Sequence, residues 1–274
     1  MDITGNAFVT GGASGIGKAC CIVLAKEGAK GILVADINLK AAEETVAEAT
    51  AAATNPSFRA EAIHLDVSDE ESVKKSVARM IESFGRIDYC VHCAGIGISK
   101  SRRLDEATFD DLKRSLAVHV HGTYLITSLI SAAMKTQDLA AVDPARPERG
   151  GTRGSIVIIG SYSSLFPIRG LAPYTAAKHA VMGIANTAAL ESAIHNISVN
   201  CVCPGWTDTP MLHHTFGVYE GMTTDSLLKT VPINRLCSPY DIADAVLFLC
   251  SPRSSYVTGL SYLVDGGMAL GMKT

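Results

Sequence analysis

Short apolar runs alternate with longer amphipathic stretches along the whole chain. The runs are rich in β-branched residues and are expected to form strands at 7–10, 31–36, 60–67, 87–93, 155–160, 197–203 and 260–264. Nearly all of their positions are apolar, rather than every second position, so both faces of each strand need cover. The pattern therefore predicts a parallel sheet with helices packed on both sides.

The stretches between these runs carry apolar residues at helical spacing. One such stripe consists of Val73, Val77, Met80, Ile81 and Phe84. The sequence Ser-Pro-Tyr-Asp at 238–241 is typical of a helix start, with a capping serine, a proline at the first position and an early acid. The alternation predicts an α/β fold, a single doubly wound (Rossmann-type) domain over 1–274 with seven parallel strands.

One segment, 135–154, interrupts this alternation. It contains two prolines, three glycines and scattered charges, and it is expected to be a surface loop inserted in the domain. The segment joins the end of a helix to the start of a strand, whereas sites in α/β proteins lie where strands end. We therefore expect it to lie far from the chemistry.

Composition and charge exclude several classes of protein. The 274 residues include 24 Lys and Arg against 27 Asp and Glu, a net charge of −3, and the 47% hydrophobic and 19% charged content is that of an ordinary globular domain. No basic patch indicates binding to nucleic acid or to an anionic membrane. Because neither a long apolar run nor a secretory leader is visible, the cytoplasm is the expected location.

Eight cysteines include a Cys-x-x-Cys pair, Cys90 and Cys93, and a Cys-x-Cys pair, Cys201 and Cys203. Both pairs fall in runs that are predicted to be buried strands, whereas a zinc site needs turns that bring four ligands together. We therefore interpret these cysteines as buried structural thiols and expect no metal.

A glycine-rich turn follows the first predicted strand. It reads Thr-Gly-Gly-Ala-Ser-Gly-Ile-Gly over 10–17, and an apolar helix follows it. Gly11, Gly15 and Gly17 allow a tight turn and close approach to a pyrophosphate at the helix start, with Ser14 and Ile16 between them. This arrangement predicts a dinucleotide site.

The second predicted strand ends at Asp36, where an acid can bond the adenosine ribose of such a cofactor. The carboxylate would repel a 2′-phosphate, and no Lys or Arg stands at 11–17 to bind one. NAD is therefore favoured over NADP.

Several further motifs make the chain resemble the short-chain dehydrogenase/reductase family over essentially its whole length. The glycine motif has that family's spacing, and Val-Asp-Gly-Gly at 264–267 is similar to its C-terminal signature. By this resemblance, further cofactor contacts are expected from Asp66, Val67, Ala94, Gly95, Pro204, Gly205, Thr207 and Thr209. Cys93 replaces the asparagine of the family's Asn-Ala-Gly turn.

The resemblance also assigns the catalytic residues. Tyr174 and Lys178 lie four positions apart, on one face of the helix that Pro173 begins, and Ser161 closes the fifth strand. A tyrosine acts as a base near neutral pH only where nearby groups stabilise its phenolate, and the Lys178 ammonium and the helix start do so. The family's roles imply that Tyr174 exchanges the substrate proton, Ser161 bonds the substrate oxygen, and Lys178 holds the cofactor.

His119 departs from the family pattern. It replaces the asparagine that usually supports a proton path, in the stretch Val-His-Val-His-Gly at 118–122. Histidine can donate, accept and titrate near neutral pH, so a proton relay is one interpretation. A buried histidine bonded to a backbone carbonyl is the other. His92 is interpreted as structural.

The segment 206–235 is similar to the family's mobile substrate lid. It holds Met211, Phe216 and further aromatic and sulfur side chains, which favour an apolar, ring-containing substrate. Tyr162, which follows the catalytic serine, is a further candidate substrate contact.

The sequence thus predicts an NAD-dependent oxidoreductase of an alcohol and its carbonyl. The alternatives are a nucleotide-sensing or interaction protein without catalysis, an NADPH-dependent ketoreductase, and a dehydratase or isomerase on the same scaffold. The family commonly forms tetramers through two long helices, here 109–135 and 174–195, so a homotetramer is expected.

Overall fold

The computed structural model describes residues 3–219 and 221–271. Positions 1–2, 220 and 272–274 lie outside the described residues. The expectation about the amino-terminal leader therefore falls partly outside them, as do the ends of the predicted domain 1–274 and one position of the lid.

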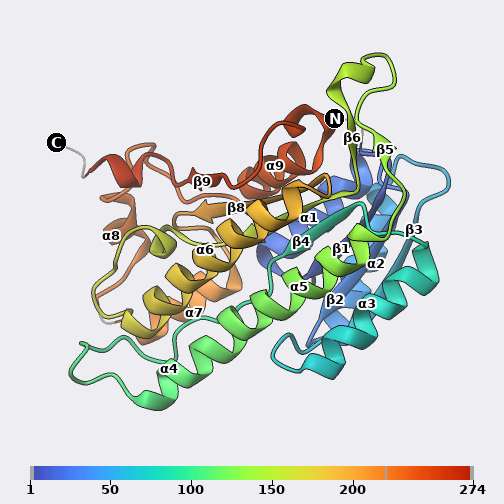
Figure 1. Ribbon diagram of the computed structural model, residues 1–274. Coiled ribbons are helices and arrows are strands. Elements are labelled where there is room, and N and C mark those ends of the chain that lie inside the picture. Colours follow the sequence, from blue (N-terminus) through green and yellow to red (C-terminus); the bar gives the residue numbers. More distant parts are fainter. Residues whose placement is uncertain (1–2, 220, 272–274) are drawn as a thin grey trace.

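The centre of the molecule is a seven-stranded parallel sheet with the strand order β3-β2-β1-β4-β7-β8-β9 (Figure 1). Its strands are β1 (Asn6–Thr10), β2 (Gly31–Asp36), β3 (Arg59–His64), β4 (Tyr89–His92), β7 (Gly154–Ile159), β8 (Ile197–Pro204) and β9 (Ser261–Val264). The order runs outward from β1 in both directions, so the predicted doubly wound fold is confirmed.

Helices cover both faces of this sheet. One face carries α1 (Gly15–Lys26), α2 (Leu39–Ala52) and α9 (Pro239–Cys250). The other carries α3 (Glu70–Phe84), α5 (Gly122–Lys135) and α6 (Ala172–Ala193). β1, β4, β7 and nearly all of β8 are buried along their length, which agrees with their continuous apolar sequence.

Local sequence signals begin and end these helices. The Asp69 side chain accepts from the backbone N–H of Glu71 at the start of α3, and Gly85 ends that helix with a φ of 79°. The expected start of α9 is present, because Ser238 and Asp241 form a reciprocal capping box around Pro239.

The segment 135–154 has more structure than the loop that its composition predicts. It holds a two-stranded antiparallel hairpin, β5 (Ala140–Ala141) and β6 (Gly151–Thr152), with a short 3₁₀ turn at Pro147–Arg149. Gly150 reverses the chain with a φ of 74°, a conformation that glycine adopts without strain. The hairpin projects beyond the ends of the sheet strands at which the chain enters them (Figure 1).

A continuous helical stretch runs from Phe109 to Lys135. It consists of α4 (Phe109–Ser115), a π-helical turn (Leu116–His121) and α5. Among the described residues, this is the one helix whose length and apolar content would suffice to cross a bilayer. Core helices of globular domains pass the same test, and α5 buries Ile126, Ile130 and Met134 against the sheet. We therefore interpret it as a core helix.

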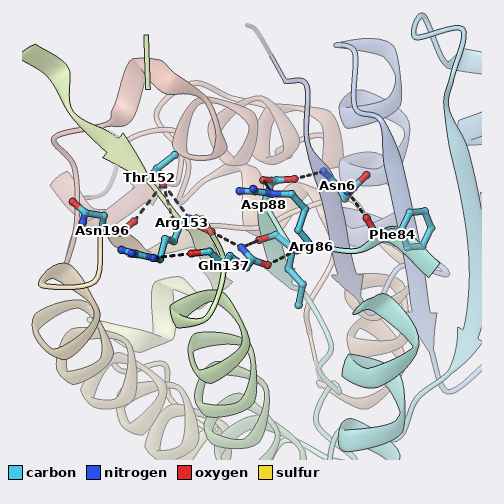
Figure 2. Close-up of polar contacts among 10 residues, drawn as sticks. Asn6, Phe84, Arg86, Asp88, Gln137, Thr152, Arg153 and Asn196 are labelled. Atoms are coloured by element: carbon cyan, nitrogen blue, oxygen red, sulfur yellow. Dashed lines mark hydrogen bonds and ion pairs between the residues drawn. The ribbon is translucent and has the colours of Figure 1, made fainter. Parts of the chain in front are cut away.

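Figure 2 shows how polar groups tie the loops together at the end of the sheet where its strands begin. The Gln137 side chain accepts from Ile87 N at 2.6 Å and donates from Nε2 to Ile87 O at 2.9 Å and Arg153 O at 2.7 Å. Arg153 in turn donates from Nε to Gln137 O and from a terminal nitrogen to His195 O. One amide thus links the segments that lead into β4 and β7.

Replacing Gln137 with leucine is expected to lower the free energy of unfolding by about 2–4 kcal/mol. Two part-buried carbonyls and one N–H lose their partner, and each unsatisfied group costs about 1–3 kcal/mol. Thermal unfolding measures the change, with Lys135→Ala, at the exposed last position of α5 two residues before Gln137, as the matched control. A Tm equal to that of the control would show that the link contributes nothing.

Candidate active site

A cavity of about 310 Å³ opens where β1, β2, β4, β7 and β8 end. It gathers most of the residues that the sequence singles out. Those that line it are Gly11, Ser14, Gly15, Ile16, Gly17, Asp36, Gly95, His119, Ser161, Tyr162, Tyr174, Lys178, Pro204, Gly205, Thr207, Thr209 and Met211. Residues more than 190 positions apart in sequence thus meet at one edge of the sheet.

The glycine turn leaves no room for side chains. A Cβ on Gly17 would lie 2.1 Å from the Gly11 carbonyl oxygen, and one on Gly11 would lie 2.7 Å from Ala94 N. Gly11 also has a φ of 65°, a conformation that L-residues adopt at a cost. The turn therefore brings bare backbone to the cavity wall.

The amino end of α1 faces this cavity without a side-chain cap. The Ser14 side chain makes no capping hydrogen bond, and no acid stands in the first turn. In contrast, Asn38, Asp69 and Thr108 cap α2, α3 and α4 with their side chains. An uncapped helix start beside a cavity is suited to an anion such as a pyrophosphate.

Asp36 braces the glycine turn from the neighbouring strand. Its Oδ2 accepts from Ala13 N at 3.0 Å, and its Oδ1 accepts from Asn38 N at 2.9 Å. Each carboxylate oxygen has a second lone pair, and Asp36 lines the cavity. The carboxylate can therefore accept from a ligand while it holds the turn.

Three predicted cofactor contacts do not line the cavity. Asp66 bonds Ser68 in its own turn, Val67 packs against Gly122, and Ala94 N donates to Thr10 Oγ1 at 3.3 Å. Asp66 and Val67 lie beyond the end of β3, which stops at His64 rather than at the expected position 67. The chain leaves the sheet there, although the apolar residues Leu65 and Val67 remain buried.

Ser161 is held in place by the turn that follows β7. Its Oγ accepts from Ser163 N at 3.0 Å, while its own N–H donates to Ser164 Oγ at 3.1 Å. Because the backbone N–H occupies a lone pair of Oγ, the hydroxyl proton is left to donate elsewhere. Ser161 is thus prepared as a hydrogen-bond donor at the cavity wall.

Tyr174 and Lys178 lie in the first two turns of α6, with Pro173 at the helix start. Lys178 is only 6% exposed, and its Nζ donates to Ile159 O at 3.0 Å. Its Nζ also lies 5.7 Å from the centre of the Tyr174 ring. An ammonium has three N–H donors, and only one of them bonds the Ile159 carbonyl oxygen. The other two can donate to a ligand in the cavity.

Two buried histidines flank the site. His92 bonds Thr10 Oγ1 through Nδ1 at 2.7 Å and Thr123 Oγ1 through Nε2 at 3.2 Å. Burial, and next the positive charge of Lys178, lower the pKa of His92 to about 3. The same two causes hold the pKa of His119 well below its ordinary value. Both rings are therefore neutral near pH 7.

Acidification is expected to destabilise the protein through these rings. Between about pH 3 and pH 6.5, unfolded chains bind a proton on His92 that the folded protein excludes, so stability falls as the pH falls. Each pH unit in this window costs about 1.4 kcal/mol per excluded proton. The loss of unfolding free energy between pH 6.5 and pH 5, measured with urea, should be about 2 kcal/mol smaller in His92→Asn than in the wild type. An equal loss in the two proteins would show that His92 does not cause the acid sensitivity.

The lid region contains α7 (Pro210–Val218) and α8 (Thr224–Leu228). Met211, Leu212 and Thr215 line the cavity, as residues at helical spacing on one face do. Phe216, predicted as a substrate contact, does not line it: the ring lies 5.7 Å from that of His213 and packs against the buried lid cluster of Leu212, Met222 and Leu227. The next position along a helix points about 100° away, so Phe216 stabilises the lid itself.

The cavity also holds residues that the sequence does not single out individually. Leu171 precedes α6, and Met268 follows the Val-Asp-Gly-Gly turn near the end of the described chain. Ile98, Ile168 and Leu212 complete an apolar wall. Leu212 belongs to the predicted lid 206–235, and the motif at 264–267 is the sequence signal nearest to Met268.

The cysteines are free thiols, as all eight lie among the described residues without a disulfide. Within residues 3–219 and 221–271, no three His, Cys, Asp or Glu side chains are grouped so as to hold a metal ion. Cys201 and Cys203 lie 3.9 Å apart, sulfur to sulfur, inside the core beside Gly160.

Comparisons with known proteins match this architecture. A family profile described as "Enoyl-(Acyl carrier protein) reductase" matches residues 11–269. The chain is 46% identical over 270 residues to the short-chain dehydrogenase fogB of Aspergillus ruber, covering 98% of both chains. It is 35% identical over 268 residues to a 2,5-dichloro-2,5-cyclohexadiene-1,4-diol dehydrogenase of Sphingobium indicum, covering 97% of this chain and 98% of that one.

Among solved structures, a 3-ketoacyl-(acyl-carrier-protein) reductase from Brucella melitensis complexed with NADH has a TM-score of 0.82. It is 29% identical, and the match covers 98% of this chain and all of the other.

Proposed function

The chain belongs to the short-chain dehydrogenase/reductase family, and we propose that it is an NAD-dependent oxidoreductase. In this proposal it interconverts a secondary alcohol on an apolar, ring-containing small molecule and the corresponding carbonyl. The observation that carries the proposal is the meeting of Ser161, Tyr174 and Lys178 with the glycine turn in one cavity.

The residues present fit a dinucleotide. The bare backbone at Gly11–Gly17 and the uncapped start of α1 would hold the pyrophosphate, and Asp36 would accept from the adenosine ribose. Lys178 would donate to the nicotinamide ribose. The bound nicotinamide supplies the hydride acceptor or donor that the reaction needs.

The chain's own residues handle the proton. The Tyr174 oxygen takes the hydroxyl proton of the alcohol during oxidation and returns it to the carbonyl oxygen during reduction. The Ser161 Oγ accepts from the Ser163 N–H through one lone pair, and its hydroxyl proton donates to the same substrate oxygen. The buried ammonium of Lys178 lies 5.7 Å from the centre of the Tyr174 ring and places a positive charge beside the group that exchanges the proton.

Charge at the adenosine end supports NAD over NADP. Apart from Lys178, no Lys or Arg lines the described cavity, so a 2′-phosphate would find no cation near Asp36. The negative Asp36 would repel it as well.

The cavity wall supports an apolar substrate. Ile98, Ile168 and Leu171 line the same cavity as Ser161 and Tyr174, together with Met211 and Leu212 from the lid. One relative with 35% identity is named for a cyclohexadiene diol, which agrees with a ring alcohol.

We further propose a cytoplasmic homotetramer. Eight free thiols agree with a reducing compartment. Tyr124, Leu190 and Ile194 are large apolar side chains on α5 and at the end of α6, and each is more than 60% exposed. Sedimentation of a monomer would contradict the assembly.

The experiment that tests the activity is NADH formation by the purified protein with NAD or NADP and a panel of cyclic secondary alcohols. The proposal predicts turnover with NAD for at least one class of ring alcohol. NADH binding in a thermal-shift assay without turnover of any alcohol would instead favour a nucleotide-sensing protein.

A further inference from the structure

The His119 ring lies between the catalytic tyrosine and the loop that begins the substrate wall. Its plane is nearly perpendicular to that of Tyr174, at 87°, with the ring centres 5.2 Å apart. On the other side, Nε2 lies 3.0 Å from the Ile96 carbonyl oxygen. His119 is 2% exposed, so these contacts are inside the protein.

These contacts fix the proton on one nitrogen. A carbonyl oxygen only accepts, so Nε2 must carry the hydrogen, and in the neutral ring Nδ1 then has a bare lone pair. Nδ1 is buried and has no hydrogen-bond partner within the part of the chain that the structure describes. The ring therefore offers no proton toward the cavity.

The surroundings disfavour a second proton on this ring. The titratable groups that face it are Lys178 and Tyr174 from α6 and His92 from β4. Protonating Nδ1 would place an unpaired cation in a buried site that already holds the Lys178 ammonium.

We propose that His119 is a neutral positioning residue that clamps the Tyr174 ring to the Ile96 loop and does not relay protons. The inference rests on the proposed function, since it assigns a role in the same reaction. Through Nε2 the ring anchors the loop that leads to Ile98, and through its edge-to-face contact it limits the movement of the Tyr174 ring. The π-helical turn Leu116–His121 carries His119 into this position.

Gly95 provides the space that this clamp needs. A Cβ at position 95 would lie 2.9 Å from Cε1 and 3.3 Å from Nδ1 of His119. The φ of Gly95 is not in the left-handed region, so the requirement for glycine here is the space taken by the imidazole.

Two substitutions separate clamping from proton relay. Glutamine at 119 can place an N–H near the position of Nε2 and keep the bond to Ile96 O, but it cannot ionise. Leucine keeps volume and loses the bond. Because a 1 Å misplacement of a catalytic group can cost about 100-fold, we expect His119→Leu to lose about 100-fold in kcat and His119→Gln less than about tenfold.

The pH profile and cofactor affinity complete the kinetic test. The clamp predicts that His119→Gln leaves the midpoint of the kcat profile unchanged and that both variants bind NADH as the wild type does. A relay predicts that Gln and Leu are equally impaired and that the profile loses one ionisation. Equal impairment, or a fully active His119→Leu enzyme, overturns the proposal.

A spectroscopic measurement decides the matter without any turnover. In protein with ¹⁵N-labelled histidine, the His119 signals, identified by their absence in His119→Gln, should show the neutral Nε2–H tautomer from about pH 5 to about pH 9. His92, whose two nitrogens both have partners, is the internal reference. Protonation of His119 within that pH range overturns the inference. Failure of the wild type to oxidise any alcohol would contradict only the proposed function.

Discussion

Replacing Tyr174 with phenylalanine is expected to lower kcat by about 10³- to 10⁴-fold while NADH still binds. The change removes one oxygen atom, and with it the group that exchanges the proton, but leaves the ring that packs against His119. Positioned acid–base groups contribute about 10²- to 10⁴-fold to turnover, and the upper part of that range applies where no other group can take the proton. Steady-state kinetics with NAD and the best alcohol of the panel would measure the loss.

Tyr256→Phe is the matched control for this experiment, because Tyr256 is fully exposed and outside the cavity. It should behave as the wild type. If Tyr174→Phe keeps more than about a tenth of the wild-type kcat, Tyr174 is not the acid–base group.

Replacing Asp36 with alanine is expected to shift the ratio of kcat/KM for NADP to that for NAD by about 100-fold toward NADP. The variant loses the charge that repels a 2′-phosphate and the acceptor for the ribose of NAD, and each effect is worth about 1–3 kcal/mol. Because Asp36 also accepts from Ala13 N, alanine weakens the glycine turn for both cofactors.

Asp36→Asn separates the two effects. The amide oxygen can keep the bond to Ala13 N, so the turn is retained while the negative charge is lost. We expect a smaller but clear shift of the ratio in this variant. A ratio unchanged in both variants would show that Asp36 does not select the cofactor.

The strands were predictable because burial on both faces leaves a continuous apolar signal. The expected bounds 31–36 coincide with β2, and the remaining strands differ by a few residues at their ends. The error at β3 has a physical cause, because Leu65 and Val67 are buried although the chain has already left the sheet.

The site residues that belong to sequence motifs could also be predicted from the sequence. The residues whose position depends on packing could not. The glycine turn, Asp36, Ser161 and Tyr174 all line the cavity as the motifs imply. An aromatic side chain such as Phe216 suits either a substrate contact or packing within the lid. Only the face of α7 on which Phe216 lies shows that it packs within the lid.

The role of His119 also could not be predicted from the sequence. Its sequence position allowed either a relay or a buried, bonded ring. The choice depends on the Ile96 carbonyl and on the space above Gly95, which the π-helical turn brings together. None of these distances has a signature in the local sequence.

The most direct test of the account is to follow the hydrogen that the reaction transfers. An active ring alcohol deuterated at its carbinol carbon is incubated with NAD and the wild-type protein, and the NADH formed is analysed by mass spectrometry. The account predicts NADH that carries a single deuterium, with almost none formed by Tyr174→Phe. NADH without deuterium, or bound cofactor with no product from any alcohol, would contradict direct hydride transfer at this site.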